Sequence, residues 1–224
     1  MTISAGNEGY QGPFYASNGS SGKNVLAVAS VDASEISALP FQATFASGGT
    51  LNTTTFGYLP SSNPWNITSM PIVPVSLNYS ATADACSPLA DTNLNLTNSI
   101  ALIRRGGCDF IVKRANVAKL GAKHFLFYTD DEPILAPTTP DFAEDIAMIE
   151  AAAGKAIIET VKSGGNVTAD FSAHESRFVG VFNSAGGIPS DYTTWGPTYD
   201  MEMKPNIAAP GRNILSTYIG GNSA

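Results

Sequence analysis

Ile100-Ala101-Leu102-Ile103-Arg104-Arg105-Gly106-Gly107-Cys108-Asp109-Phe110 is the stretch of this chain that decides its fold. Its first four residues are apolar, which predicts a buried strand, and the glycine pair predicts a turn before a helix. The apolar run 124–128 predicts a second strand after that helix. A strand, a helix and a strand in this order imply a right-handed crossover and parallel pairing of the two strands.

The helix between these strands has a predicted apolar face. Ile111, Ala115 and Ala118 recur at helical spacing, so we expect them to face the core. Gly121 follows in the position of a C-terminal cap. The neighbouring basic side chains are expected on the surface: Lys113, Arg114 and Lys119.

Farther out, residues 151–163 predict a second helix that stops at a glycine pair, and 166–171 alternate polar and apolar residues like a return strand. The fold class is therefore α+β. Toward the ends, the apolar runs 25–31 and 178–182 predict strands, the first of the kind buried in a parallel sheet, and a further strand is expected at 213–218. The turn-rich stretch from about residue 45 to residue 74 predicts β-hairpins and loops.

The stretch quoted first resembles the core of the protease-associated (PA) domain: a strand, an Arg-Gly, a Cys and an amphipathic helix ending in Gly-Ala, here Gly121-Ala122. This resemblance implies a mixed, barrel-like sheet with flanking helices. It is also associated with substrate access and protein contacts.

Two outer stretches resemble subtilisin-like serine proteases, the subtilases: Ser4-Ala5-Gly6-Asn7-Glu8-Gly9, and Trp195-Gly196-Pro197-Thr198 with 204–211. The resemblance implies part of a secreted subtilase with an inserted PA domain, and it makes Asn7 the oxyanion-hole asparagine. Subtilisin's asparagine is the standard example of such a donor, and its removal costs about two to three orders of magnitude in turnover. The expected organisation is a partial subtilase segment at 1–45, a linker at 46–74, the PA domain at 75–172 and a second partial subtilase segment at 173–224.

The sequence motifs that supply the catalytic triad of subtilases do not occur in this sequence. A Ser-His-Asp mechanism needs a nucleophile, a base and an orienting carboxylate, but the family's Asp-Thr-Gly, His-Gly-Thr and Gly-Thr-Ser-Met-Ala stretches do not occur. The first two are expected before residue 1 and the third after residue 224. His124 and His174 lack the motif context, and Asp170, Ser172 and His174 lie too close along one strand to converge. We expect no enzyme activity from this chain alone.

Composition excludes several classes of partner. Lys and Arg number 12 against 19 Asp and Glu, for a net charge of −7, which argues against nucleic acid and anionic membrane surfaces. No apolar run is long enough for a transmembrane helix, and the first residues do not read as a signal peptide.

Six Asn-X-Ser/Thr triplets are candidates for glycosylation and, with the family resemblance, favour an extracellular protein. Some could arise by chance in a sequence rich in Asn, Ser and Thr. They start at Asn18, Asn52, Asn66, Asn78, Asn95 and Asn166.

Cys86 and Cys108 are the only cysteines. In a secreted protein an even pair predicts a disulfide, worth about 3–4 kcal/mol of stability. Two free buried thiols are the alternative, whereas metal ligation is disfavoured because no histidine lies near them and no Cys-X-X-Cys occurs.

Three further features invite a functional reading. Acidic residues at 130–132 and 141–145 could hold calcium, although the proline-rich spacing lacks a calcium-loop pattern and fits a solvated loop or partner surface better. Arg104 and Arg105 could grip a carboxylate, or one of them could be an exposed strand-end residue. The aromatic side chains near the hairpins could stack on sugars or form a small core under long loops: Phe56, Tyr58, Trp65 and Tyr79.

These observations predict first a non-catalytic module that contacts a protein or peptide or guards substrate access. One alternative is a portion of an active serine endopeptidase, completed by further polypeptide. Another is a stand-alone protein that binds carbohydrate or protein. A homodimer is a further expectation, since the outer strands need partners: either they pair with each other or a second copy supplies them. No cofactor is expected.

Overall fold

The structure is a computed structural model, and it describes residues 1–89, 93–129, 132–139, 145–172, 178–212 and 214. The chain divides into two compact units. One combines Met1–Ser37 with Phe182–Ala224, and the other is Ala38–Val181. None of the helices in the described residues is long and apolar enough to cross a membrane.

The unit made from the two ends of the chain contains a three-stranded sheet, ordered β1-β2-β11, in which both pairings are parallel. Its strands are β1 (Thr2–Ser4), β2 (Leu26–Asp32) and β11 (Ile207–Arg212), with a short 3-10 turn, η1 (Gly9–Gln11). The outer segments thus pair with each other, the first of the two arrangements expected. The last strand begins earlier than predicted, and Pro210 is tolerated inside it because β11 lies at the sheet edge. Of the predicted strand 213–218, all but residue 214 lies outside the described residues.

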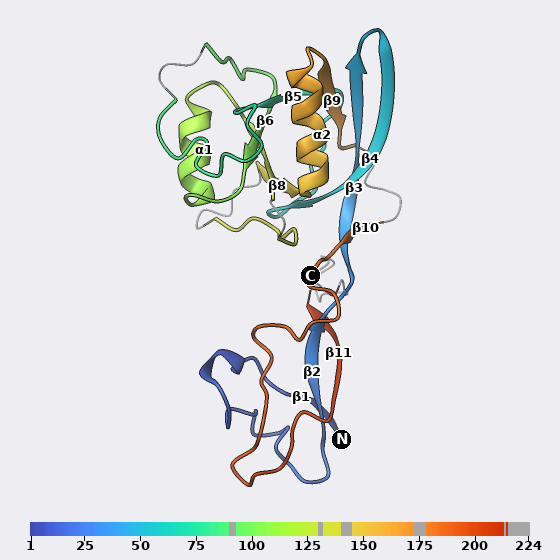
Figure 1. Cartoon of the computed structure of the whole chain (residues 1–224), viewed down its shortest axis with the longest axis vertical. Helices are drawn as coiled ribbons and strands as arrows, with labels where there is room; N and C mark the ends of the chain where they lie inside the picture. The colour runs from blue at the N-terminus through green and yellow to red at the C-terminus, as the bar shows by residue number, and fades with distance from the viewer. Residues whose placement is uncertain (90–92, 130–131, 140–144, 173–177, 213, 215–224) are drawn as a thin grey trace. The chain divides into compact units, whose positions relative to one another are not determined.

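The central unit is a mixed β-barrel with two flanking helices (Figure 1), which confirms the predicted α+β fold class. Seven strands run in the order β3-β4-β8-β7-β6-β5-β9, and a further pairing of β9 with β3 closes the ring. An eighth strand, β10, adds to β3. The bounds are β3 (Glu35–Ser47), β4 (Thr50–Pro60), β5 (Met70–Pro74), β6 (Ile100–Arg104), β7 (His124–Tyr128), β8 (Ile146–Ile149), β9 (Asn166–Asp170) and β10 (Val179–Phe182).

The predicted strand–helix–strand unit is confirmed, because β6 and β7 pair in parallel across α1 (Phe110–Ala118). The second helix, α2 (Ala151–Lys162), packs against β5, β7 and β9. Strands β6, β7 and β8 are buried almost throughout, as expected of strands covered on both faces.

The expected linker at 46–74 belongs to the barrel. It supplies β4, β5 and the end of β3, and the hairpin pairs Leu39 with Tyr58 through Ser47 with Thr50. Aromatic burial explains this difference: Phe41, Tyr58 and Phe171 form one core cluster with Trp65, and their ring centroids lie 4.7–5.0 Å apart in the closest pairs. The compact unit therefore starts at Ala38 rather than at residue 75.

The predicted face of the first helix is wrong. Ile111, Ala115 and Ala118 are exposed, whereas Lys113, Asn116 and Val117 are buried. The buried face differs from the predicted one because Asp84 and the Ala85 carbonyl accept hydrogen bonds from Lys113 and Asn116. The apolar pattern alone does not reveal these partners.

Candidate functional site

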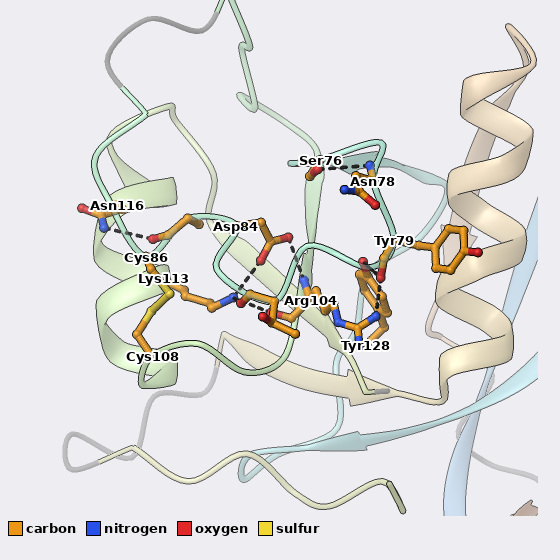
Figure 2. A network of polar contacts seen from close by, with 12 residues as sticks. Ser76, Asn78, Tyr79, Asp84, Cys86, Arg104, Cys108, Lys113, Asn116 and Tyr128 are labelled. Atoms are coloured by element: carbon orange, nitrogen blue, oxygen red, sulfur yellow. Dashed lines mark hydrogen bonds and ion pairs between the residues drawn. A yellow bond between two sulfur atoms is a disulfide. The ribbon is translucent and has the colours of Figure 1, made fainter. Parts of the chain in front are cut away.

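A disulfide and a set of polar contacts anchor the loop that follows β5 to α1 and to the residues just before it (Figure 2). Cys86 and Cys108 form the predicted disulfide, and their Cα atoms are 5.8 Å apart. Next to it, the side-chain amide of Asn116 donates to the Ala85 carbonyl at 3.0 Å. The loop is thereby held against the helix from two neighbouring positions.

The centre of this network is a buried ion pair between Lys113 and Asp84. The two side chains are 0% and 4% exposed, and Nζ lies 2.7 Å from Oδ1. The ammonium group also donates to the carbonyls of Thr82 and Arg104, each at 2.7 Å. All three of its N–H donors therefore have an acceptor, which is what a buried charge requires.

Burial acts on the titration of both partners. It lowers the pKa of Lys113 and raises the pKa of Asp84, because desolvation penalises each charged form, while the attraction between the two opposes both shifts. The other carboxylate oxygen of Asp84 accepts from the backbone N–H of Arg104 at 3.0 Å. The pair thus links the loop, β6 and α1 and serves the architecture.

Beyond the ion pair, the network reaches the carboxyl ends of β6 and β7. Arg104 and Tyr128 are register partners there, and both donate to the backbone carbonyl of Tyr79, the tyrosine hydroxyl at 3.3 Å. Burial raises the pKa of Tyr128 to about 12, so this phenol is neutral and remains a donor at ordinary pH. These residues line a pocket of about 290 Å³.

The two arginines singled out in the sequence point to different places. Arg104 lines the pocket just described, whereas Arg105 pairs with Glu132 at 3.4 Å and lines another pocket. They do not act as a pair on one carboxylate.

Asn7 lies in the loop after β1 and is exposed. Hydrogen bonds to Thr194 fix this loop: the backbone N–H of Thr194 donates to the Gly6 carbonyl at 2.9 Å, and the backbone N–H of Glu8 donates to the Thr194 hydroxyl at 3.0 Å. Asn7 borders a pocket of about 510 Å³ on this sheet, together with residues of β1, β2 and β11. Its amide is accessible to a ligand from outside this unit.

The residues weighed as a triad do not form one in the described part of the chain. Contrary to expectation, Ser172 and Asp170 do converge: the serine amide and hydroxyl both donate to Oδ1 of Asp170, at 2.8 and 2.6 Å, and Ser172 lies beyond the last residue of the strand. His174 lies outside the described residues. The ring of His124 lies tilted against that of Trp65, with centroids 5.5 Å apart, and burial lowers the pKa of this imidazole.

The aromatic residues weighed as a sugar platform separate into two groups. Tyr58 and Trp65 are buried in the barrel core, with Phe56 packed against it. Tyr79 is 43% exposed and borders the pocket beside Arg104.

All six glycosylation candidates are exposed, as attachment of a glycan requires: Asn18, Asn52, Asn66, Asn78, Asn95 and Asn166. Two of them shape their loops, since Asn78 and Asn95 accept from the amides of Ser80 and Thr97 at 3.1 and 3.0 Å. Their occupancy remains a prediction.

Most of the acidic stretch considered for calcium, including Asp130, Asp131 and residues 141–144, lies outside the described residues. Glu132 and Asp145 are engaged by Arg105 and Arg114. Within the described ranges, no group of three His, Cys, Asp or Glu side chains is placed to hold a metal ion.

Sequence reasoning missed the two partners of the buried ion pair, Asp84 and Lys113. A usable signal exists for one of them: Lys113 stands at i, i+3 and i+4 spacing with Asn116 and Val117, which marks an alternative helix face. Asp84 carries no such mark, because its partners Arg104 and Lys113 are remote in sequence.

Residues 68–158 match the family model described as the PA domain. Three curated relatives are peptidases. The probable leucine aminopeptidase 2 of Aspergillus fumigatus is 31% identical over 166 residues, 64% of this chain and 33% of that protein. The minor extracellular protease Vpr of Bacillus subtilis is 28% identical over 55% of this chain and 14% of its own length. The C5a peptidase of Streptococcus pyogenes is 35% identical over 55% of this chain and 10% of its own length.

Among solved structures, an aminopeptidase from Aneurinibacillus sp. strain AM-1 matches with a TM-score of 0.42 and 21% identity, covering 66% of this chain and 34% of that one. The zinc aminopeptidase BSAP from Bacillus subtilis matches with a TM-score of 0.37 and 20% identity, covering 68% and 35%.

The matched segment spans a third or less of the length of these curated relatives. Vpr is extracellular by its description, and the disulfide is typical of proteins from oxidising compartments. The chain therefore contains a PA domain at residues 68–158 and is distantly homologous, across this region, to subtilases and to aminopeptidases.

Proposed function

We propose that this chain acts as a non-catalytic module of a secreted subtilase, in which the PA domain contacts a protein or peptide and guards access to substrate. The observation that carries this proposal is the similarity of its PA region to those of two proteases, Vpr and the C5a peptidase. An aminopeptidase and an extracellular protease both match the chain, so the proposed role does not depend on one kind of peptidase.

The outer unit supports the assignment to a subtilase. The segments that resemble the family come together in one parallel sheet, and Asn7 follows the first strand of that sheet. A lone oxyanion donor has no charge to stabilise without a nucleophile. The sequence carries none of the three triad motifs.

The test measures binding and hydrolysis on the same preparation. The intact chain, immobilised through a C-terminal tag, is titrated with dephosphorylated casein by biolayer interferometry, and casein cleavage is followed in parallel. We expect saturable binding, no cleavage and no labelling by a fluorophosphonate. Absence of binding would refute the interaction role, and stoichiometric labelling of a serine would refute the non-catalytic one.

A second candidate is a portion of an active endopeptidase, completed by further polypeptide. It is favoured by the pocket of about 510 Å³ beside Asn7, which is lined by all three strands of the outer sheet. Expression of the full-length gene product, with and without Asn7→Ala, tests this second candidate. The candidate requires that the substitution lower turnover by about two orders of magnitude or more.

A further inference from the structure

The pocket of about 290 Å³ in the central unit is built where four segments meet. It lies at the carboxyl ends of the parallel strands β6 and β7 and beside the first turn of α2. The loop after β5 closes it, as Figure 2 shows for the ring of Tyr79, which points toward α2. Its lining residues are Tyr79, Ser80, Arg104, Tyr128, Thr129, Ala151, Ala152 and Lys155.

The ionisable groups of this lining favour an anion. Arg104 and Lys155 are cations, Tyr128 is a neutral donor, and no carboxylate is among the lining residues. Such a basic pocket stands out on a chain with a net charge of −7. A guanidinium offers five donors in a fixed plane, and its contacts with the Tyr79 carbonyl and with Tyr128 hold that of Arg104 at the pocket wall.

Lys155 is only loosely held. Its Nζ lies 5.3 Å from the centre of the Tyr79 ring and 3.9 Å from Glu159, and both members of that ion pair are more than half exposed. Exposed pairs of this kind contribute little. The lysine therefore reorients toward a bound anion at low cost.

The helix end adds backbone donors to the same pocket. Ala151 and Ala152 are the first residues of a 12-residue helix, and the preceding Glu150 makes no side-chain capping bond. The first N–H groups of a helix have no acceptor within it and carry a partial positive charge. Gly154 lets this helix end approach β7, since a Cβ there would lie 2.5 Å from Cγ of Tyr128.

We infer that this pocket binds a carboxylate group of a peptide, supplied by its C-terminus or by an Asp or Glu side chain. Arg104 receives the carboxylate in its plane, the first amides of α2 donate to it, and Lys155 neutralises it from the rim. The half-exposed ring of Tyr79 offers an apolar surface to the adjoining peptide residue. The inference rests on the proposed interaction role and names the chemistry that the PA domain recognises.

The experiment is a ¹H–¹⁵N NMR titration of the intact chain, produced in a bacterial periplasm so that the disulfide forms and Asn78, next to Tyr79, carries no glycan. Three probes are compared: acetyl-Ala-Ala-Phe with a free carboxylate, the same peptide as its amide, and acetyl-Ala-Glu-Phe-amide. We expect saturable shifts of the Ala151 and Ala152 amides with at least one carboxylate probe and none with the neutral amide. Which of the two carboxylate probes binds identifies the source of the group.

Lys155→Glu should lower the affinity for the carboxylate probe by about tenfold, because a cation at the pocket rim becomes an anion. The matched control is Lys162→Glu, an exposed lysine in the last turn of the same helix that does not line the pocket, and it should change affinity less than about twofold.

Three results would overturn the inference: equal shifts with the neutral amide, equal weakening by both lysine substitutions, or binding of inorganic phosphate when neither carboxylate probe binds. Its failure is distinct from failure of the proposed function. If casein binds while no carboxylate probe does, the pocket assignment falls and the interaction role stands. If a carboxylate probe binds while casein does not, the pocket assignment stands, and of the proposed function only contact with an intact protein substrate falls.

Discussion

The buried ion pair makes a quantitative prediction for Asp84→Asn. This change keeps the shape of the side chain and an oxygen acceptor for the Arg104 amide, but it removes the charge that faces Lys113. Lys113 keeps two carbonyl acceptors. The substitution therefore isolates the electrostatic part of the interaction.

The loss of stability caused by Asp84→Asn has an upper limit, because an unpaired lysine can lose its proton. Two unit charges 2.7 Å apart attract by about 6 kcal/mol at an effective dielectric of about 20, and desolvation offsets part of this. An unpaired Lys113 can also lose its proton, which from a reference pKa of 10.5 costs about 5 kcal/mol at pH 7. We expect a loss of about 3–5 kcal/mol in the free energy of unfolding, a large share of a typical total.

Guanidinium unfolding measures this loss through the fluorescence of Trp65, which is buried in the barrel core. Trp195 belongs to the other unit, so all proteins carry Trp195→Phe. Glu159→Gln, which breaks an exposed ion pair, is the control and should change stability by less than about 0.5 kcal/mol.

The Asp84→Asn protein should also gain stability as the pH rises toward 10. Burial lowers the pKa of Lys113 in the folded state, so the unfolded chain binds more protons and folding is favoured at higher pH. A loss below about 1 kcal/mol, or no such gain with pH, would refute the assignment of a buried, charged pair.

Three other substitutions probe the same unit. Cys86→Ala with Cys108→Ala removes a bond that spans 22 residues and should lower stability by about 3 kcal/mol, measured by the same unfolding assay; two alkylatable thiols in the unreduced native protein would contradict it. Tyr128 has a pKa raised to about 12, so the folded state keeps a proton that the unfolded state loses. Stability should therefore fall from pH 10 to 12 by up to about 2.7 kcal/mol, and Tyr128→Phe should remove that part of the fall in alkaline denaturation. Gly154→Ala places a Cβ about 2.5 Å from the Tyr128 ring and should cost about 1–3 kcal/mol; an unchanged melting temperature would show that α2 does not approach β7 so closely.

Local patterns were sufficient for the central strand–helix–strand unit and for the disulfide. The apolar run 100–103, the glycine pair and the run 124–128 predict a parallel strand–helix–strand unit, and the structure contains it. The two cysteines predict their own disulfide because no other pairing exists. The first signal depends only on neighbouring residues, and the second allows a single pairing because the chain has two cysteines.

Local patterns failed where a partner lies far along the chain. The apolar periodicity of α1 favours the face of Ile111, yet the helix buries Lys113 because Asp84, 29 residues earlier, offers a counter-charge. The stretch 46–74 reads as a linker by composition, but its aromatic residues complete the barrel core with Phe171.

The sequence by itself determined the central strand–helix–strand unit, the second helix, the disulfide and the likeness to a PA domain, because these depend on neighbouring residues and on short motifs. Only the tertiary structure decided that β9 closes the barrel on β3 and that Arg104, Tyr128 and Lys155 share one pocket. The physical reason is that ring closure and charge compensation join residues far apart in the chain, and the energy of such contacts depends on distance and burial in space, which sequence spacing does not record.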